Sequence, residues 1–241
     1  MDFNIYDIYT DASINLDKKL GCSGAVVVDR KQNKIVDEIY ALRSNATNNM
    51  SEIIAIWLAV YKAAGLKYSE TIPFQVNIFS DSKISLFGLR EWIFGWIKNR
   101  KGDTLINSTG AVSNQEWFRD CFHTIIASNI KLKFFHQKGH VNENSIQSLY
   151  EAERTFRTSN IHSPHMIGTN SNILAIYNNY VDNTTRNHIN TVLSGIDPRT
   201  IPNMAFIGDS YGPIMQFEFK DSEIDYYKSL IAGGLNYPKF Y

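Results

Sequence analysis

The order of strand-like and helix-like segments is the feature that most limits how this 241-residue chain can fold. Three strand patterns come first, in FNIYDIYT, GAVVVD and KIVDEIYAL, and polar or glycine-containing turns separate them. Apolar residues at helical spacing in SEIIAIWLAVYKAAGL then predict a helix, and VNIFS predicts a fourth strand after it. Two further helical patterns lead to a fifth strand in KLKFFHQ. Since a helix that connects two parallel strands packs on their sheet, this order predicts a layered α/β domain.

Composition is that of an ordinary globular protein. Hydrophobic residues make up 44% of the chain, which is enough for a sizeable core, and no apolar run is long enough to span a bilayer. The N-terminal segment lacks the basic and apolar regions of a signal peptide. Cys22 and Cys121 alone cannot form a disulfide framework. We therefore expect a soluble, cytoplasmic protein with no membrane partner.

Charge is balanced over the whole chain, with 24 Lys and Arg against 24 Asp and Glu, and by itself predicts no polyanion partner. Between residues 83 and 138, however, basic residues outnumber acidic ones. Such a local excess is either a solvated face or a surface that attracts phosphate groups. Charge alone leaves both alternatives open.

Three acidic residues stand at the ends of predicted elements. Asp11 ends the first strand, Asp81 ends the fourth, and Glu52 lies in the first turn of the helix between the third and fourth strands. Carboxylates gathered at one sheet edge repel one another unless a cation is present, and hard oxygen ligands suit Mg²⁺ or Mn²⁺. Two such ions can activate a water and stabilise the leaving oxygen in phosphodiester cleavage. The alternative is that the three acids are unrelated caps and turn residues.

The local contexts of these acids favour the metal-site interpretation. YTDAS at 9–13, TNNMSE at 47–52 and FSDSK at 79–83 resemble, in order and spacing, the acidic motifs of type 1 ribonuclease H. KGH at 138–140 resembles that family's histidine loop, so the matches cover residues 1–141. A segment between them resembles the family's basic protrusion and contains Trp92, Trp96, Lys98, Arg100 and Lys101.

This resemblance implies an α/β, ribonuclease H-like fold with a five-stranded mixed sheet flanked by helices. It also implies an endoribonuclease that hydrolyses the RNA strand of RNA/DNA hybrids and leaves 3′-hydroxyl and 5′-phosphate ends. Two Mg²⁺ ions are the implied cofactors, with Mn²⁺ as a possible substitute. The RNA/DNA hybrid is the implied partner.

The fourth carboxylate of the family is not where its usual spacing predicts. The family carries it on a helix after the histidine loop, in an Asn-Glu-x-x-Asp pattern, but Tyr150 stands ten residues beyond His140. Further along, NNYVD at 178–182 keeps the Asn and the Asp of the pattern and replaces its Glu by Asn179. We infer that residues from about 142 to 176 are an insertion and that Asp182 is the fourth ligand. The competing interpretation is that Glu143 substitutes for it.

The insertion leads to further expectations. The pattern SIQSLYEAERTFR predicts a helix within it, and we expect its body to lie beside the substrate groove as a lid or an extra contact surface. Residues 1–195 would then form the catalytic domain. Residues 196–241, with a strand signal in MQFEFK and a helix signal in DSEIDYYKSLI, would form a C-terminal extension of unknown role.

By the same resemblance, individual residues acquire expected roles. Asp11, Glu52, Asp81 and Asp182 would hold the metal ions, and His140 would transfer a proton or assist product release. Asn48 and Asn49 can both donate and accept hydrogen bonds, as recognition of a 2′-hydroxyl requires. The expected contacts to the DNA strand and to phosphate groups are Thr47, Lys83, Trp92, Trp96, Lys98, Arg100 and Lys101.

Two rival functions stay open. One is a structure-selective DNA nuclease of the same superfamily, such as a Holliday-junction resolvase, although the Asn48-Asn49 pair and the tryptophan pair argue against it. The other is a non-catalytic nucleic-acid-binding module. A module without catalysis would be free to lose its acidic residues, and this sequence keeps all four.

Overall fold

The computed structural model describes residues 4–160, 171–207 and 219–232. Their centre is a sheet of six strands in the order β7-β4-β1-β2-β3-β8, and a short hairpin, β5-β6, lies apart from it. The strands are β1 Asn4–Asn15, β2 Leu20–Asp29, β3 Lys34–Arg43, β4 Phe74–Ser80, β5 Ile106–Asn107, β6 Gly110–Ala111, β7 Leu132–His136 and β8 Met204–Phe206. The helices are α1 Asn48–Ser69, α2 Lys83–Phe87, the π-helix η1 Gly88–Trp92, α3 Ile93–Lys98, α4 Gln115–Ser128, α5 Ile146–Ser159, α6 Ser171–Leu193, the 3₁₀ helix η2 Pro198–Thr200 and α7 Asp221–Ala232.

The predicted mixed α/β sheet is confirmed, with one correction. Strands β1, β2 and β3 form an antiparallel meander, whereas β4 pairs in parallel with β1 and β7 in parallel with β4. The sheet has a sixth strand, because β8 pairs in parallel with β3 through Tyr40 and Met204. Five strands were predicted, since a three-residue segment carries no alternating pattern of its own. The MQFEFK signal falls largely outside the described residues.

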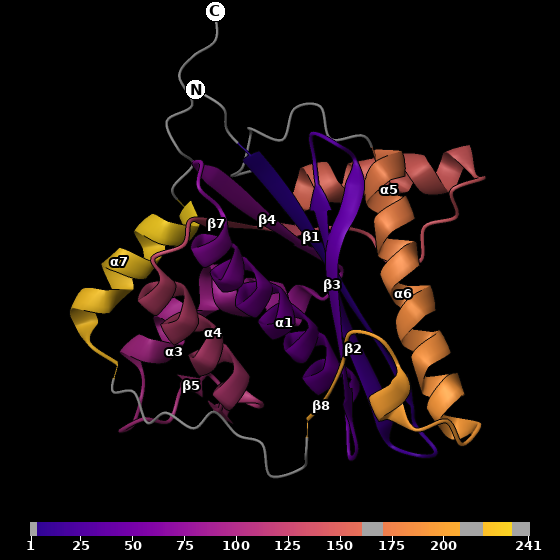
Figure 1. The fold of residues 1–241 in the computed structure, drawn as a ribbon. Helices are drawn as coiled ribbons and strands as arrows, with labels where there is room; N and C mark the ends of the chain where they lie inside the picture. The colour runs from indigo at the N-terminus through magenta and orange to yellow at the C-terminus, as the bar shows by residue number, and fades with distance from the viewer. Residues whose placement is uncertain (1–3, 161–170, 208–218, 233–241) are drawn as a thin grey trace, which may run out of the picture.

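Helices cover both faces of the sheet (Figure 1). Because successive side chains of a strand point to opposite faces, β1 sends Ile8 into the core beneath α1 and α4, and Tyr9 into the core beneath α6. Tyr9 stacks on Phe79, with ring centroids 4.9 Å apart, and Phe79 stacks on Phe135. The aromatic face thus extends across β1, β4 and β7, next to the strand ends that carry the acids.

The described part of the predicted insertion packs on the sheet and does not project over the acidic residues. Helix α5 forms as predicted, with Ser145 as its N-cap, and Phe156 stacks on both Phe79 and Phe135. None of its described residues lines the pocket that holds Asp11. The lid interpretation therefore has no support in the described residues, while residues 161–170 lie outside them.

The C-terminal segment also contacts the rest of the fold. Tyr227 of α7 is fully buried, and its hydroxyl donates a hydrogen bond to the carbonyl oxygen of Leu89 at 3.0 Å. Its ring stacks on Phe122 of α4. Together with β8, this packing places residues of the predicted extension in the sheet and in the main core. No helix within the described residues is long and apolar enough to cross a membrane.

Candidate active site

Four carboxylates lie near the place where the pairing of β1 with β4 ends, at Thr10 and Ser80. Asp81 follows β4 directly, but Asp11 does not end its strand as predicted, because β1 continues to Asn15. Asp11, Glu52 and Asp81 line one pocket of about 210 Å³, which also contains His140. Asp182 of α6 lines an adjoining pocket of about 380 Å³, and His140 borders this one too. The structure therefore gathers all the predicted metal-binding acids, and the predicted histidine, around one edge of the sheet.

Asp11 and Asp182 are the two buried acids of this group, and each is 8% exposed. The Oδ1 of Asp11 accepts a hydrogen bond from the backbone N–H of Ala12 at 2.7 Å, and its Oδ2 lies 3.5 Å from the donating amide nitrogen of Asn178. Burial raises the pKa of Asp11 from 3.8 to about 8, and the charges of Asp81, Asp182 and Glu52 add to this effect, whereas the Ala12 N–H opposes it.

The pKa of Asp81 is raised in the same way. Burial and the charge of Glu52 raise its pKa from 3.8 to about 6, while His140 acts in the opposite direction. The loop after β7 approaches Asp81 so closely that a Cβ on Gly139 would lie 1.9 Å from Asp81 Oδ2. The glycine of the KGH motif is therefore required by this contact, because no side chain fits between the loop and the carboxylate.

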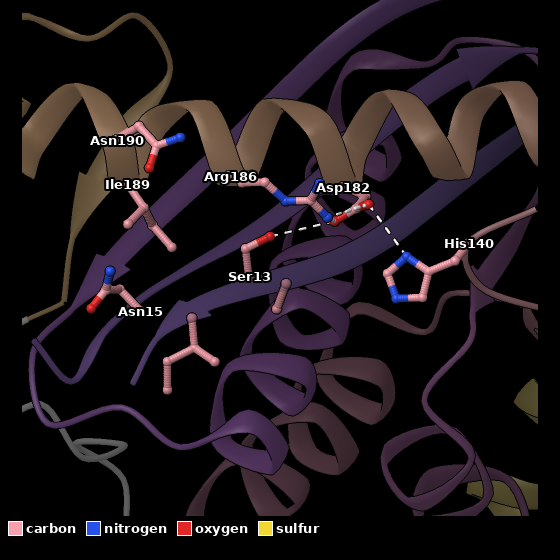
Figure 2. Close-up of a pocket in the computed structure, with 9 residues that line it drawn as sticks. Ser13, Asn15, His140, Asp182, Arg186, Ile189 and Asn190 are labelled. Carbon is pink, nitrogen blue, oxygen red and sulfur yellow. Dashed lines mark hydrogen bonds and ion pairs between the residues drawn. The ribbon is translucent and has the colours of Figure 1, made fainter. Parts of the chain in front are cut away.

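Glu52 and Asp182 are oriented by neighbouring side chains. The hydroxyl of Ser82, which caps α2, donates a hydrogen bond to Glu52. Figure 2 shows Asp182 at the centre of a small network: one nitrogen of Arg186 lies 2.9 Å from each carboxylate oxygen, and Ser13 Oγ donates at 3.5 Å. His140 Nδ1 lies 3.5 Å from Asp182 Oδ2.

The two candidates for the fourth acid lie in different places. Asp182 is close enough to Asp11 and Asp81 to raise the pKa of both. Glu143 is exposed and accepts a hydrogen bond from the amide of Asn179 at 2.7 Å. It lines neither pocket. The arrangement favours Asp182.

The donor set fits hard divalent cations. Within the described residues, no group of three or more Asp, Glu, His or Cys side chains is drawn together closely enough to form a metal site as it stands. The carboxylates nevertheless share one edge, and their mutual repulsion adds to the effect of burial in raising the pKa values of Asp11 and Asp81. Carboxylate oxygens are the ligands that Mg²⁺ and Mn²⁺ prefer, and a cation would remove this repulsion.

The predicted nucleic-acid contacts fall into two groups. Those of the first group are accessible: Asn48 lines the pocket that contains Asp11, Asn49 is exposed beside it, and Trp92 is 41% exposed. Trp96 is half-buried and packs edge-on against Phe118. The side chains of Lys83, Lys98 and Lys101 are exposed.

The second group makes contacts within the protein. Arg100 donates to Asp221, the first residue of α7, at 3.2 Å and to the carbonyl oxygen of Phe219 at 3.1 Å, so it connects the basic segment to the start of α7. Thr47 is exposed but also caps α1, because its hydroxyl accepts a hydrogen bond from the N–H of Met50. Sequence reasoning could not detect the Arg100 contacts, since these partners lie about 120 positions away in the chain.

Two site residues were missed by sequence reasoning. Ser13 lies two positions after Asp11 on β1, and Arg186 follows Asp182 by one helical turn. The spacing of i and i+4 on one helix face was a usable signal for Arg186, because such residues are neighbours. No local pattern marked Ser13, whose partner is on a different element.

Comparisons with known proteins give matches to a single family. A family model described as RNase H matches residues 4–148. The ribonuclease H of Neorickettsia sennetsu is 34% identical over 125 residues, which are 52% of this chain and 74% of that protein. The ribonuclease H of Rhizobium johnstonii is 31% identical over 93 residues, which are 39% of this chain and 55% of that protein. The chain thus spans about three quarters of the first relative and about half of the second.

One solved structure that matches part of the chain is described as LC9-RNase H1, a type 1 RNase H with the type 2 active-site motif. It has 17% sequence identity and a TM-score of 0.45, over 66% of this chain and 75% of that chain. The family match ends at residue 148, just after α5 begins, so Asp182 lies beyond it.

Proposed function

The chain belongs to the ribonuclease H family, and we propose that Asp11, Glu52, Asp81 and Asp182 are the residues with which it hydrolyses the RNA strand of RNA/DNA hybrids. The resemblance predicted from the acidic motifs is confirmed by the match of residues 4–148 to that family. The observation that carries the residue assignment is the convergence of four mutually repelling carboxylates at one sheet edge.

Two Mg²⁺ ions, with Mn²⁺ as a substitute, are the cofactors of this proposal. Bound there, they supply an activated water and neutralise charge on the cleaved phosphate. Asp11 is held for this task by Ala12 and Asn178, and Glu52 is oriented by Ser82. These contacts keep carboxylate oxygens directed at the pocket before the substrate arrives, which lowers the reorganisation that catalysis requires.

His140 is suited to proton transfer near the leaving group. Its side chain is 76% exposed, and its Nδ1 lies beside Asp182. A histidine accepts and releases protons near neutral pH. Cleavage on this scheme leaves a 3′-hydroxyl and a 5′-phosphate.

Substrate recognition divides between the two strands of the hybrid. Asn48 and Asn49, at the start of α1, contact the RNA strand, where amides can pair with the 2′-hydroxyl. The contacts to the DNA strand and its phosphates are Thr47, Lys83, Trp92, Trp96, Lys98 and Lys101. Arg100 contributes indirectly, since its guanidinium is engaged with Asp221 and with the backbone of Phe219.

We further propose that residues 1–195 form the catalytic domain, with an insertion at about 142–176, and that residues 196–241 support it. The pairing of β8 with β3 and the burial of Tyr227 are the observations behind the supporting role. A cytoplasmic location is part of the proposal, and it is compatible with the free, buried thiols of Cys22 and Cys121.

Incubation with strand-labelled RNA/DNA, RNA/RNA and DNA/DNA duplexes, in Mg²⁺ or in chelator, tests this function. We expect cleavage of the RNA strand of the hybrid alone, dependent on Mg²⁺ and lost in Asp11→Asn. Cleavage of DNA/DNA at a comparable rate would replace the proposal by the structure-selective DNA nuclease. Tight binding of hybrids without cleavage would point to the non-catalytic module.

A further inference from the structure

His140 occupies an uncommon backbone conformation. Its φ is +51°, in the left-handed region that residues with a Cβ rarely adopt. Such a conformation costs free energy and persists only where surrounding contacts impose it. The side chain is 76% exposed, so packing of the imidazole itself is not what imposes it. The contacts that do so lie on either side of His140 in the chain.

Before His140, the loop is fixed by two contacts. The ammonium of Lys138 forms an ion pair with Glu151 of α5. Gly139 lies directly against the carboxylate of Asp81, where a Cβ has no room. The loop therefore runs between α5 and the acidic residues with little freedom to move toward either.

After His140, the chain enters a small apolar cluster. Val141 is only 4% exposed and packs with Ala152 of α5 and Ala175 of α6. This cluster is separate from the two larger cores of the protein. Burial of Val141 anchors the residue that follows the histidine, which limits the positions that the histidine can take.

Asn179 of α6 makes two further contacts with this loop. Its side-chain amide nitrogen donates to the carbonyl oxygen of Val141 at 2.8 Å and to Glu143 Oε1 at 2.7 Å. An amide can supply both hydrogens, whereas a carboxylate at this position could supply neither. Asn179 is the residue that departs from the family's Asn-Glu-x-x-Asp pattern, and the two bonds explain why an amide suits this chain.

We propose that Asn179 and Val141 are positioning residues, which together with α5 hold the histidine loop so that His140 stays beside Asp182. This inference rests on the proposed role of His140 in hydrolysis. It assigns the predicted insertion a task different from that of a lid, because α5 braces a catalytic loop and leaves the substrate pocket open. We call Asn179, Val141 and α5 the brace. None of them lines the pocket that contains Asp11, so the brace acts on the chemical step through His140 and not on hybrid binding.

Kinetics of Asn179→Leu and Val141→Ala in the full chain test the proposal. We expect kcat to fall by about tenfold, because small displacements of a catalytic group are costly, with KM for the hybrid nearly unchanged. Asn183→Ala is the matched control, since Asn183 is an exposed asparagine one turn further along α6. In a His140→Ala background, Asn179→Leu should cause no further loss, because the brace acts through the histidine. An equal loss in both backgrounds, or a change confined to KM, would overturn the proposal.

Hydrogen exchange of the segment 138–145 supplies a readout that does not depend on activity. Asn179→Leu should speed exchange there, and Asn183→Ala should not. If the leucine variant does not fold, Asn179→Asp keeps the size of the side chain and removes both donors. Unchanged exchange in a folded variant would refute the brace. If the wild-type protein cleaved no hybrid, the proposed function would fail, while exchange would still decide whether the brace exists.

Discussion

Replacing Asp81 by Asn is predicted to abolish hybrid cleavage and, in chelator, to stabilise the fold. Burial and the charge of Glu52 raise the pKa of Asp81 from 3.8 to about 6, so the folded state disfavours the ionised form. A pKa difference of one corresponds to about 1.4 kcal/mol. The difference between 3.8 and about 6 therefore bounds the cost of this ionised group in the folded state at about 3 kcal/mol.

The increase in the free energy of unfolding caused by Asp81→Asn should be smaller than this bound. An asparagine at the same place still loses hydration on folding, so we expect about 1 to 2 kcal/mol, or about 2 to 8 °C in Tm for a chain of this size. The pH dependence follows from the raised pKa. Below about pH 4, Asp81 is protonated in both the folded and the unfolded state and the variant gains nothing; above about pH 6, the full gain is present.

Thermal unfolding in chelator between about pH 4 and about pH 8 measures this gain. Asp17→Asn is the control, because Asp17 is exposed in the turn after β1. Added Mg²⁺ should raise the Tm of the wild type more than that of Asp81→Asn, since the cation neutralises the same repulsion. A folded Asp81→Asn protein with a lower Tm than the wild type at pH 8 in chelator, or with normal turnover, would refute the reasoning.

Three further outcomes are expected. Asp182→Asn should lower kcat by at least about a hundredfold while Glu143→Gln stays within about twofold of wild type, and the reverse result would move the fourth ligand to the insertion. Joint replacement of Lys98 and Lys101 by Ala should raise KM and leave kcat little changed. The slope of log K for hybrid binding against log salt concentration should fall in magnitude by about 2. A fall in kcat alone would contradict a phosphate-binding role. Gly139→Ala should cost about 1 to 3 kcal/mol in urea unfolding, because its Cβ would collide with the Asp81 carboxylate. A variant as stable as wild type would show that the loop can move away.

Short-range patterns were sufficient for most of the sheet and for three of the acids. Strands β1, β2, β3, β4 and β7 and helix α1 follow from alternation and helical spacing, which depend only on residues a few positions apart. Asp81 could be placed directly after a strand for the same reason. Asp11 and Glu52 were predicted on the right elements but at the wrong places in them: β1 continues past Asp11 to Asn15, and Glu52 lies beyond the first turn of α1. The family resemblance then joined these positions into one site.

Other features depend on contacts between distant residues, and the tertiary structure alone decided them. Strand β8 has three residues and exists because the edge of β3 offers unpaired backbone groups. Arg100 was predicted to contact phosphate because its segment resembles the family's basic protrusion, and only the structure shows that its guanidinium also contacts Phe219 and Asp221. Sequence also could not tell where helix α5 packs, because only the contacts of Phe156 with the aromatic face place it. Periodicity records which face of a segment is buried; it does not record which segment buries it.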